Sequence, residues 1–130
     1  MVQTSNTPLK VFLADDSRLI RDRVGAMLAA SDMVVVGQAS TPAGSIEGIL
    51  SARPHVVVLD VQLEGGSGLE VLRAVRSAAP EIAVVVFSNN ASPAYRKRYL
   101  YDGAVVFLDK SIDFDQLAQA VANTRRPAAL

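Results

Sequence analysis

The chain of 130 residues contains no cysteine and no tryptophan, and it has a single histidine. The absence of cysteine excludes disulfides, thiolate metal sites and a cysteine nucleophile. The 13 basic side chains are matched by 13 acidic ones, so no net charge draws the chain toward nucleic acid or anionic lipid. No apolar run approaches the roughly 20 residues that a membrane span requires. Half of all residues are hydrophobic and one fifth are charged, which is the balance of a globular protein.

The length fits one ordinary domain. The first eight residues are polar and lack the charged and then apolar layout of a signal peptide. We therefore expect a cytoplasmic protein with one domain at residues 9–124, between short tails at 1–8 and 125–130. Because the sequence starts with Met1 and leaves only a short tail after Thr124, we also expect this domain to stand alone.

Five short, valine-rich runs punctuate the sequence and show no alternation of apolar and polar residues. This pattern is typical of strands that are covered on both faces of a parallel sheet. The expected strands are Val11–Ala14, Met33–Val36, Val56–Leu59, Ile82–Phe87 and Val105–Leu108.

Segments with helical spacing of apolar residues lie between these runs. Helix starts are indicated by Ser17, and by Thr41 and Ser92, each of which precedes a proline; Gly103 indicates a helix end. This alternation predicts an α/β fold of five βα units, a doubly wound, five-stranded parallel sheet with right-handed crossovers. The expected apolar stripes are Leu19, Ile20, Val24, Met27 and Leu28, then Leu69, Val71, Leu72 and Val75, and finally Ile112, Leu117 and Val121.

Charged and hydroxyl side chains stand where the predicted strands end: Asp15 and Asp16, Asp60, Ser88 and Lys110. In such folds ligands bind beyond the carboxyl ends of the strands, so we expect these side chains to share one edge of the sheet. Neighbouring carboxylates repel one another unless a cation joins them, and oxygen ligands favour Mg²⁺ or Mn²⁺. A nearby lysine can pair with an anionic group on Asp60.

Each of these residues also has an ordinary interpretation. Asp15 or Asp16 could cap the first helix, and Asp60 could open the turn that follows it. Ser88 could be a simple strand-end hydroxyl, and Lys110 a solvated charge. It is their combination at separate strand ends that favours a functional site.

The chain resembles the response-regulator receiver family over about residues 9–124. No single motif is specific, but the ordered set at these spacings is. The matching motifs are the acidic pair Asp15-Asp16, the apolar run that ends in Asp60 with Gly65, Gly66 and Gly68 after it, Ser88 after an apolar strand, Gly103-Ala104, and Phe107 three residues before Lys110.

The resemblance implies a phosphorylation-dependent switch of a two-component system, with the flavodoxin-like strand order 2-1-3-4-5. Asp60 would be the nucleophile and phosphoacceptor, and a histidine kinase or a histidine phosphotransfer protein would be the donor. Lys110 and Ser88 would contact oxygens of the phosphoryl group. The protein would catalyse only its own phosphotransfer and dephosphorylation, and would not be an enzyme otherwise.

The resemblance also implies a Mg²⁺ site, or a Mn²⁺ site, made by the side chains of Asp16 and Asp60 and the backbone carbonyl of Gln62. Asp15 would hold a metal-bound water. Gln62 and Asn90 would flank the path of the attacking water and tune the lifetime of the phosphoryl group.

Signalling would run from Ser88 to Phe107 and out to the surface of the fourth helix, fifth strand and fifth helix. A permanently buried Phe107 is the alternative. We expect this surface to bind a downstream protein or to form a homodimer, and we expect no binding to DNA or membranes. The fourth helix carries Tyr95, Tyr99 and Tyr101 with three consecutive basic residues between them. They form either a partner-binding surface or a solvated basic face over aromatic packing.

Three departures from the family pattern stand near the expected site. Glu64 occupies the usual place of a proline and is expected to loosen the turn after Asp60. Asn89 is bulkier than the usual small residue and is expected to restrict access. Ser111 replaces a proline after Lys110, which puts the cis peptide of the family in doubt here. His55 falls at the start of its strand, opposite Asp60, so we expect a structural role for it.

Three alternatives stay open. A haloacid-dehalogenase-type phosphatase would carry a second aspartate where this chain has Gln62. A flavodoxin-like FMN carrier would need a hydroxyl- and glycine-rich phosphate loop where this chain has Asp15 and Asp16. A degenerate receiver that never takes phosphate would not need the complete set of acids, serine and lysine.

Overall fold

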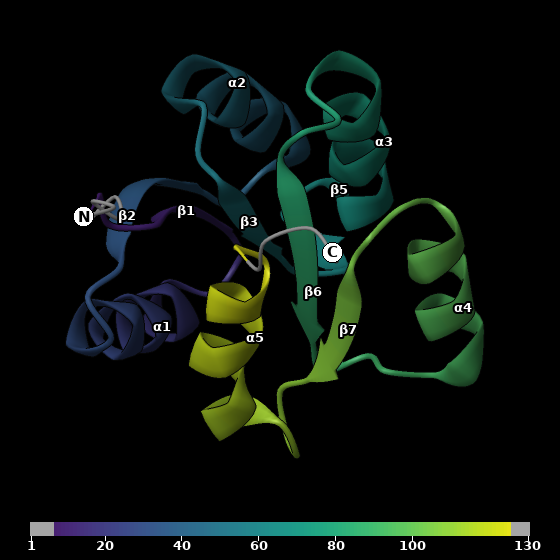
Figure 1. Ribbon diagram of the computed structural model, residues 1–130. Coiled ribbons are helices and arrows are strands. Elements are labelled where there is room, and N and C mark those ends of the chain that lie inside the picture. The colour runs from purple at the N-terminus through teal and green to yellow at the C-terminus, as the bar shows by residue number, and fades with distance from the viewer. Residues whose placement is uncertain (1–6, 126–130) are drawn as a thin grey trace, which may run out of the picture.

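The computed structural model of the chain describes residues 7–125. Five parallel strands form one sheet in the order β2-β1-β3-β6-β7, with every pair in parallel register (Figure 1). Counted along the sheet strands alone, this is the predicted order 2-1-3-4-5. The strands are β1 (Lys10–Ala14), β2 (Val34–Ala39), β3 (Val56–Leu59), β6 (Ala83–Ser88) and β7 (Val106–Asp109).

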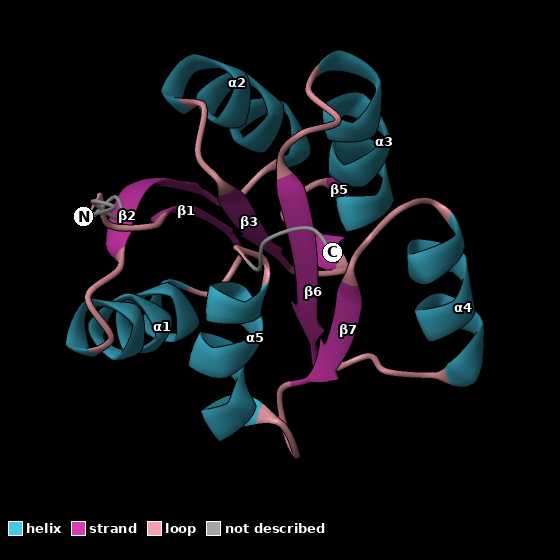
Figure 2. Cartoon of the chain, in the orientation of Figure 1, coloured by secondary structure: helices cyan, strands magenta, loops and turns pink. Residues whose placement is uncertain are grey.

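Helices cover both faces of this sheet (Figure 2). Helices α1 and α5 pack on one face and α2, α3 and α4 on the other, and each layer has its own cluster of buried apolar residues. The predicted doubly wound α/β architecture is therefore confirmed. The helices are α1 (Arg18–Ala30), α2 (Pro42–Ala52), α3 (Gly68–Ala78), α4 (Pro93–Tyr101) and α5 (Leu117–Asn123), the last preceded by the 3-10 turn η1 (Phe114–Gln116).

Hydroxyl caps begin three of the helices at the predicted residues. The side chains of Ser17, Thr41 and Ser92 accept hydrogen bonds from the backbone three residues ahead, at 3.2, 3.0 and 3.3 Å. Each bond satisfies an amide that the first turn of a helix would leave unpaired. Gly103 follows the end of α4 with a φ of 112°, a backbone conformation that favours glycine.

Two residues of the predicted apolar stripes are not in the core. Leu19 is 70% exposed and Ile112 is 75% exposed. Leu19 lies in the first turn of α1, on the side away from the sheet. Ile112 lies in the turn between β7 and η1, because α5 begins only at Leu117. The edge strand β2 has helices on both faces, α1 and α2, as expected, but none of its residues is fully buried, and Val34 at its start is 44% exposed.

A small antiparallel hairpin after β3 was not expected from the sequence. It pairs β4 (Gln62–Leu63) with β5 (Gly66–Ser67), and Gly65 turns it with a φ of 81°. Glu64 lies in this turn, and its amide donates to the carbonyl of Ser40 at 2.8 Å. The segment is thus hydrogen-bonded to its neighbours, and a loosening of the turn by Glu64 stays a prediction.

The expected tails fall mainly outside the described residues. Of the positions that are described, Arg125 donates from Nη1 to the carbonyl of Thr7 at 2.8 Å, so the two ends of the domain lie together. Within residues 7–125, no helix has both the length and the apolar character that crossing a bilayer demands.

Candidate functional site

The carboxyl ends of β1, β3, β6 and β7 surround a shallow hollow of about 400 Å³. Strands of one parallel sheet all end at the same edge, which is why residues far apart in sequence meet there. The hollow collects most of the residues that the sequence singled out. Its lining consists of Asp16, Ser17, Ile20, Asp60, Gln62, Ser88, Asn89, Asn90 and Lys110.

Three carboxylates converge at this edge. One oxygen from each of Asp15, Asp16 and Asp60 lies within 4.8 Å of the others. Asp15 and Asp60 are each only 6% exposed, whereas Asp16 is exposed to solvent. Asp15 is further held by the amide of Ser17, which donates to its Oδ1 at 2.9 Å. The acidic pair is thus divided into one buried member and one open member.

Lys110 bridges the two buried carboxylates. Its Nζ lies 2.7 Å from Oδ2 of Asp15 and 3.0 Å from Oδ2 of Asp60. The side chain is buried with its partners, at 8% exposure for the residue. The ordinary interpretation of Lys110 as a solvated charge is therefore wrong, because two carboxylates replace the water that its ammonium would otherwise need.

The pKa values in the cluster reflect burial opposed by pairing. Burial raises the pKa of Asp15, although the hydrogen bonds from Lys110 and from the Ser17 amide lower it. Burial lowers the pKa of Lys110, but the hydrogen bond to Asp15 and the charge of Asp60 raise it by more, so that its pKa lies above the ordinary value. The lysine is therefore charged at neutral pH, and it is an internal counter-ion of the site.

This donor set suits a hard divalent cation. With Asp15, Asp16 and Asp60 ionised, the single ammonium of Lys110 leaves a surplus of two negative charges. All the side-chain ligands are carboxylate oxygens, which Mg²⁺ and Mn²⁺ prefer. The residues present thus fit the cation that the sequence predicted.

A family model described as the response regulator receiver domain matches residues 11–122. The chain belongs to this family. The match covers most of the chain and includes every residue assigned to the candidate site, so the family resemblance of the motifs is confirmed.

Individual relatives agree with this assignment. The receiver is 33% identical to the DNA-binding transcriptional activator DevR/DosR of Mycobacterium tuberculosis over 87% of its own length and 52% of the relative. It superposes with a TM-score of 0.83 and 32% identity on a signal receiver domain from Mycobacterium tuberculosis described as that of NarL, covering 89% of this chain and 94% of that one. The response regulator domain of Thermotoga maritima CheB gives a TM-score of 0.79 at 26% identity, over 92% and 95% of the two chains.

The receiver spans about half the length of the curated relatives it matches. Those relatives carry names of transcriptional regulators. The match alone does not assign the activities of these whole proteins to this chain.

Ser88 and Phe107 lie on neighbouring strands of the receiver. Ser88 is 1% exposed, and its Oγ accepts a hydrogen bond from the amide of Asn90 at 3.0 Å. Phe107 is 3% exposed and lies beneath the guanidinium of Arg96, which is 5.1 Å from the ring centroid. Arg96 also donates to the carbonyl of Phe107 at 2.8 Å, so this basic residue belongs to the packing and not to a solvated face.

The backbone after Lys110 is ordinary. None of the peptide bonds within residues 7–125 is cis, so the link from Lys110 to Ser111 is trans. Asn89 lines the hollow and is exposed, and its effect on access stays a prediction.

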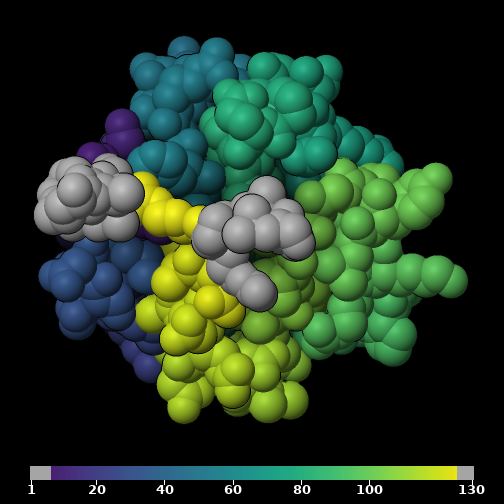
Figure 3. All heavy atoms as spheres, viewed as in Figure 1, coloured from purple at the N-terminus to yellow at the C-terminus, as the bar shows by residue number. Residues whose placement is uncertain are grey.

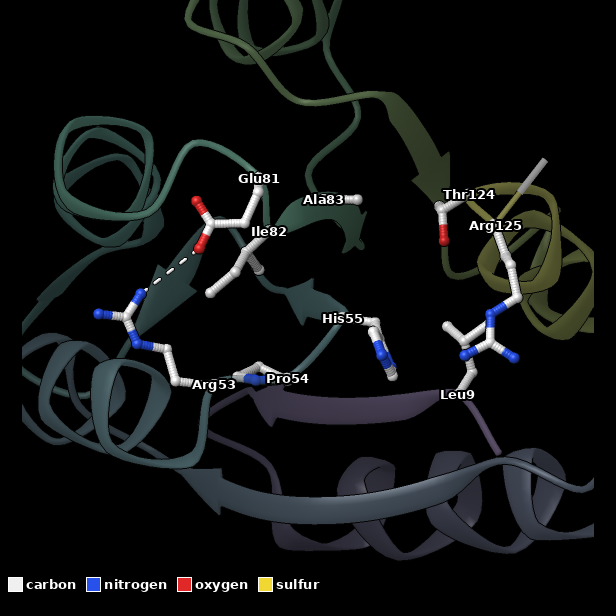
Figure 4. Close-up of a pocket in the computed structure, with 9 residues that line it drawn as sticks. All are labelled: Leu9, Arg53, Pro54, His55, Glu81, Ile82, Ala83, Thr124 and Arg125. Atoms are coloured by element: carbon white, nitrogen blue, oxygen red, sulfur yellow. Dashed lines mark hydrogen bonds and ion pairs between the residues drawn. The ribbon is translucent and has the colours of Figure 1, made fainter. Parts of the chain in front are cut away.

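His55 lies at the opposite end of the sheet, as expected. There it lines a second hollow of about 310 Å³ together with Arg53, Glu81 and Arg125 (Figure 4). Its Nδ1 accepts a hydrogen bond from the amide of Lys10 at 2.9 Å, which ties β3 to β1. Burial, with the positive charges of Arg125 and Lys10, lowers the pKa of His55. The histidine has a structural partner and no contact with the carboxylate cluster.

Two features of the site were not foreseen from the sequence. The bridge from Lys110 to Asp15 joins residues that no local pattern relates. The hydroxyl of Tyr99 approaches the carbonyl of Val61, the residue after Asp60, at 3.5 Å. The only available signal for Tyr99 was its helical spacing from Tyr95, which indicated a shared face but not what that face would contact.

Proposed function

We propose that this receiver takes a phosphoryl group onto Asp60 from a phosphohistidine of a histidine kinase or a histidine phosphotransfer protein. The observation that carries the proposal is the buried Asp60 carboxylate at the edge of the hollow, paired with Lys110 at 3.0 Å. A carboxylate held in this way faces an opening and has a fixed positive charge beside it.

In the transfer, an oxygen of Asp60 forms a bond to phosphorus as the bond from phosphorus to the donor histidine nitrogen breaks. The electron pair of that bond stays with the departing imidazole. Lys110 and the hydroxyl of Ser88 are the groups proposed to contact the oxygens of the phosphoryl group, where the charge gathers. Both residues line the same hollow as Asp60.

The metal would be held by the side chains of Asp16 and Asp60 and by the carbonyl of Gln62, with Asp15 orienting a metal-bound water. Bound there, Mg²⁺ would supply positive charge that lets an anion approach the carboxylates. The surplus negative charge of the cluster supports this assignment. Gln62 and Asn90 both line the hollow and are the proposed tuners of phosphoryl lifetime.

The output would leave through α4, β7 and α5, with Ser88 and Phe107 as the link. For phosphorylation to shift the side chains of Ser88 and Phe107 between two arrangements, the phosphoryl group must interact more favourably with one arrangement than with the other. Tyr101 is 86% exposed, and Tyr95 and Leu100 are 41% and 42% exposed, so α4 offers apolar surface for a downstream protein or a second copy. In Figure 3 the green segment that contains α4 stands at the edge of the molecule with long side chains reaching outward. A cytoplasmic location of the protein and an absence of DNA binding by this domain stay predictions.

A receiver that never takes phosphate is the remaining alternative, since membership of the family removes the phosphatase and the FMN carrier. Incubation with acetyl phosphate and Mg²⁺, followed by intact mass measurement, separates the two. We expect one phosphoryl group on the wild type, none without a divalent cation and none on Asp60→Asn. Glu81→Gln, at the other end of the sheet, is the matched control and should label fully. Full labelling of Asp60→Asn would move the acceptor elsewhere.

A further inference from the structure

Helix α4 is anchored to the rest of the receiver by one buried side chain. Tyr99 is 2% exposed and is the only buried residue of the helix. Its ring packs edge-on against Phe107, with centroids 6.0 Å apart, and against Tyr95 at 6.3 Å. The position of α4 on the sheet therefore depends on this ring, together with the contact of Arg96 with Phe107.

The hydroxyl of Tyr99 reaches the segment that follows the phosphoacceptor. It donates to the carbonyl of Val61 at 3.5 Å, and this carbonyl also accepts from the amide of Gly68 at 2.7 Å. Burial raises the pKa of Tyr99 to about 12, against the lowering effects of the Leu69 amide and the Ser67 hydroxyl. The phenol is thus protonated at neutral pH and can act as a donor.

One peptide unit connects this hydroxyl to Asp60. The carbonyl of Val61 and the amide of Gln62 belong to the same peptide bond, and that amide donates to Oδ1 of Asp60 at 3.4 Å. A peptide bond is planar and stiff, so its two polar atoms turn together. Both contacts, at 3.5 and 3.4 Å, are longer than ordinary hydrogen bonds and therefore weak, so a small shift of the peptide would strengthen or break either one.

We propose that Tyr99 is a positioning residue that couples Asp60 to α4 through the Val61–Gln62 peptide. A new substituent on Asp60 changes what the Gln62 amide can donate to, the peptide tilts, and the Val61 carbonyl moves relative to the phenol. This connection meets the link between Ser88 and Phe107 where the Tyr99 ring packs on Phe107, but it reaches the acceptor segment through a hydroxyl that Phe107 lacks. The inference rests on the proposed phosphorylation of Asp60 for its use in signalling, but not for the coupling itself.

The coupling is tested first in the free protein by amide hydrogen exchange. Tyr99→Phe removes the hydroxyl and keeps the ring, and Tyr95→Phe is the matched control on the same helix. Exchange in Tyr99→Phe should rise about threefold or more both in residues 61–68 and in residues 93–101, as the loss of one neutral hydrogen bond would produce. Tyr95→Phe should leave residues 61–68 unchanged. Unchanged exchange of residues 61–68 in Tyr99→Phe would overturn the proposal.

The second arm adds Mg²⁺ and beryllofluoride, which mimics a phosphoryl group. Tyr99→Phe should bind the mimic as the wild type does but lose about half or more of the change in protection at residues 93–101. A full response of α4 in this variant would overturn the coupling and leave the proposed function intact. If the wild type binds no mimic, the proposed function fails, and the exchange of the free proteins still decides the coupling.

A measurement on the wild type guards against a variant that does not fold. Carbon-13 at Cζ of tyrosine reports hydrogen bonding of the hydroxyl, so the resonance of Tyr99 should shift on addition of the mimic, and by more than that of Tyr95. A Tyr99 resonance that does not move while the mimic is bound would overturn the proposal.

Discussion

The two ends of the sheet hold charged residues in opposite settings. At the carboxyl end, Asp15, Asp60 and Lys110 are 6%, 6% and 8% exposed and touch one another. At the amino end, the side chains of Arg53 and Glu81 pair at 3.5 Å while remaining 57% and 68% exposed. One end has more carboxylates than cations, and the other has an ion pair that water already solvates.

This difference indicates which of the two charged clusters can be explained by stability and which cannot. An exposed ion pair contributes about 0–1 kcal/mol to the free energy of unfolding, and when one partner is removed, water still solvates the other charge. A buried cluster costs several kcal/mol in desolvation, and pairing recovers this only in part when the charges do not balance. A fold gains no stability from a surplus of buried carboxylates, which is why we propose the carboxyl end of the sheet as the binding site for a cation and a phosphoryl group.

The largest difference between the ends should appear when their basic residues are removed. Lys110→Met keeps the aliphatic stem but leaves Asp15 and Asp60 without a counter-ion, and we expect a loss of about 3–5 kcal/mol in unfolding free energy. Arg53→Met at the amino end should cost less than about 1 kcal/mol. Urea unfolding without divalent cations measures both, and saturating Mg²⁺ should restore part of the stability of Lys110→Met. Equal losses in the two variants would mean that the buried bridge contributes no more to the free energy of unfolding than the exposed ion pair does.

A smaller effect, on Mg²⁺ affinity, should distinguish Asp15 from Asp16. Asp16 is open to the hollow and Asp15 is paired with Lys110, so Asp16→Ala should weaken Mg²⁺ binding more than Asp15→Ala does. We expect a loss of about tenfold or more for Asp16→Ala, or about 1.4 kcal/mol. Calorimetric titration gives the affinities, and Glu81→Ala serves as the control from the other end. The reverse order would show that Asp15 is the direct ligand.

A still smaller effect concerns the lifetime of the phosphoryl group. Gln62 and Asn90 carry amides, which can hydrogen-bond a water but cannot act as a base near neutral pH. Gln62→Met and Asn90→Ala should change the dephosphorylation rate by roughly two- to tenfold, at most about 1.4 kcal/mol in barrier height. The decay of phosphorylated protein, followed by intact mass, measures the rates, while Mg²⁺ affinity should change little. Identical decay in both variants and the wild type would remove these residues from the water path.

The smallest effect belongs to His55 at the amino end. Its pKa is lowered from the ordinary 6.5, so the folded protein holds the proton less tightly than the unfolded chain does. The contribution of neutral His55 is present above that pH and declines as the pH falls through 6.5 and below. His55→Asn keeps an acceptor for the Lys10 amide and should reduce the drop in stability between about pH 7.5 and about pH 5.5. An unchanged drop, measured by urea unfolding, would show that other groups produce it.

Much of the fold could be predicted because its determinants are local. Valine-rich runs without alternation are typical of buried strands, and a hydroxyl residue before a proline indicates a helix start, as Thr41 and Ser92 do here. Once the strands are parallel, their carboxyl ends meet, so Asp60, Ser88 and Lys110 had to share an edge. The partial exposure of β2 was missed because a valine-rich run indicates a strand but not how much cover an edge strand receives.

The sequence by itself therefore determined the parallel sheet, three of the helix starts and which residues gather at one edge. Only the tertiary structure decided that Lys110 is buried between Asp15 and Asp60, that Asp16 stays open, and that Tyr99 contacts Val61. Periodicity places a residue on a face of its own element, within a few neighbours in the chain. The distance between two residues 38 or 50 positions apart depends on how whole elements pack, and that packing sets burial, pairing and pKa together.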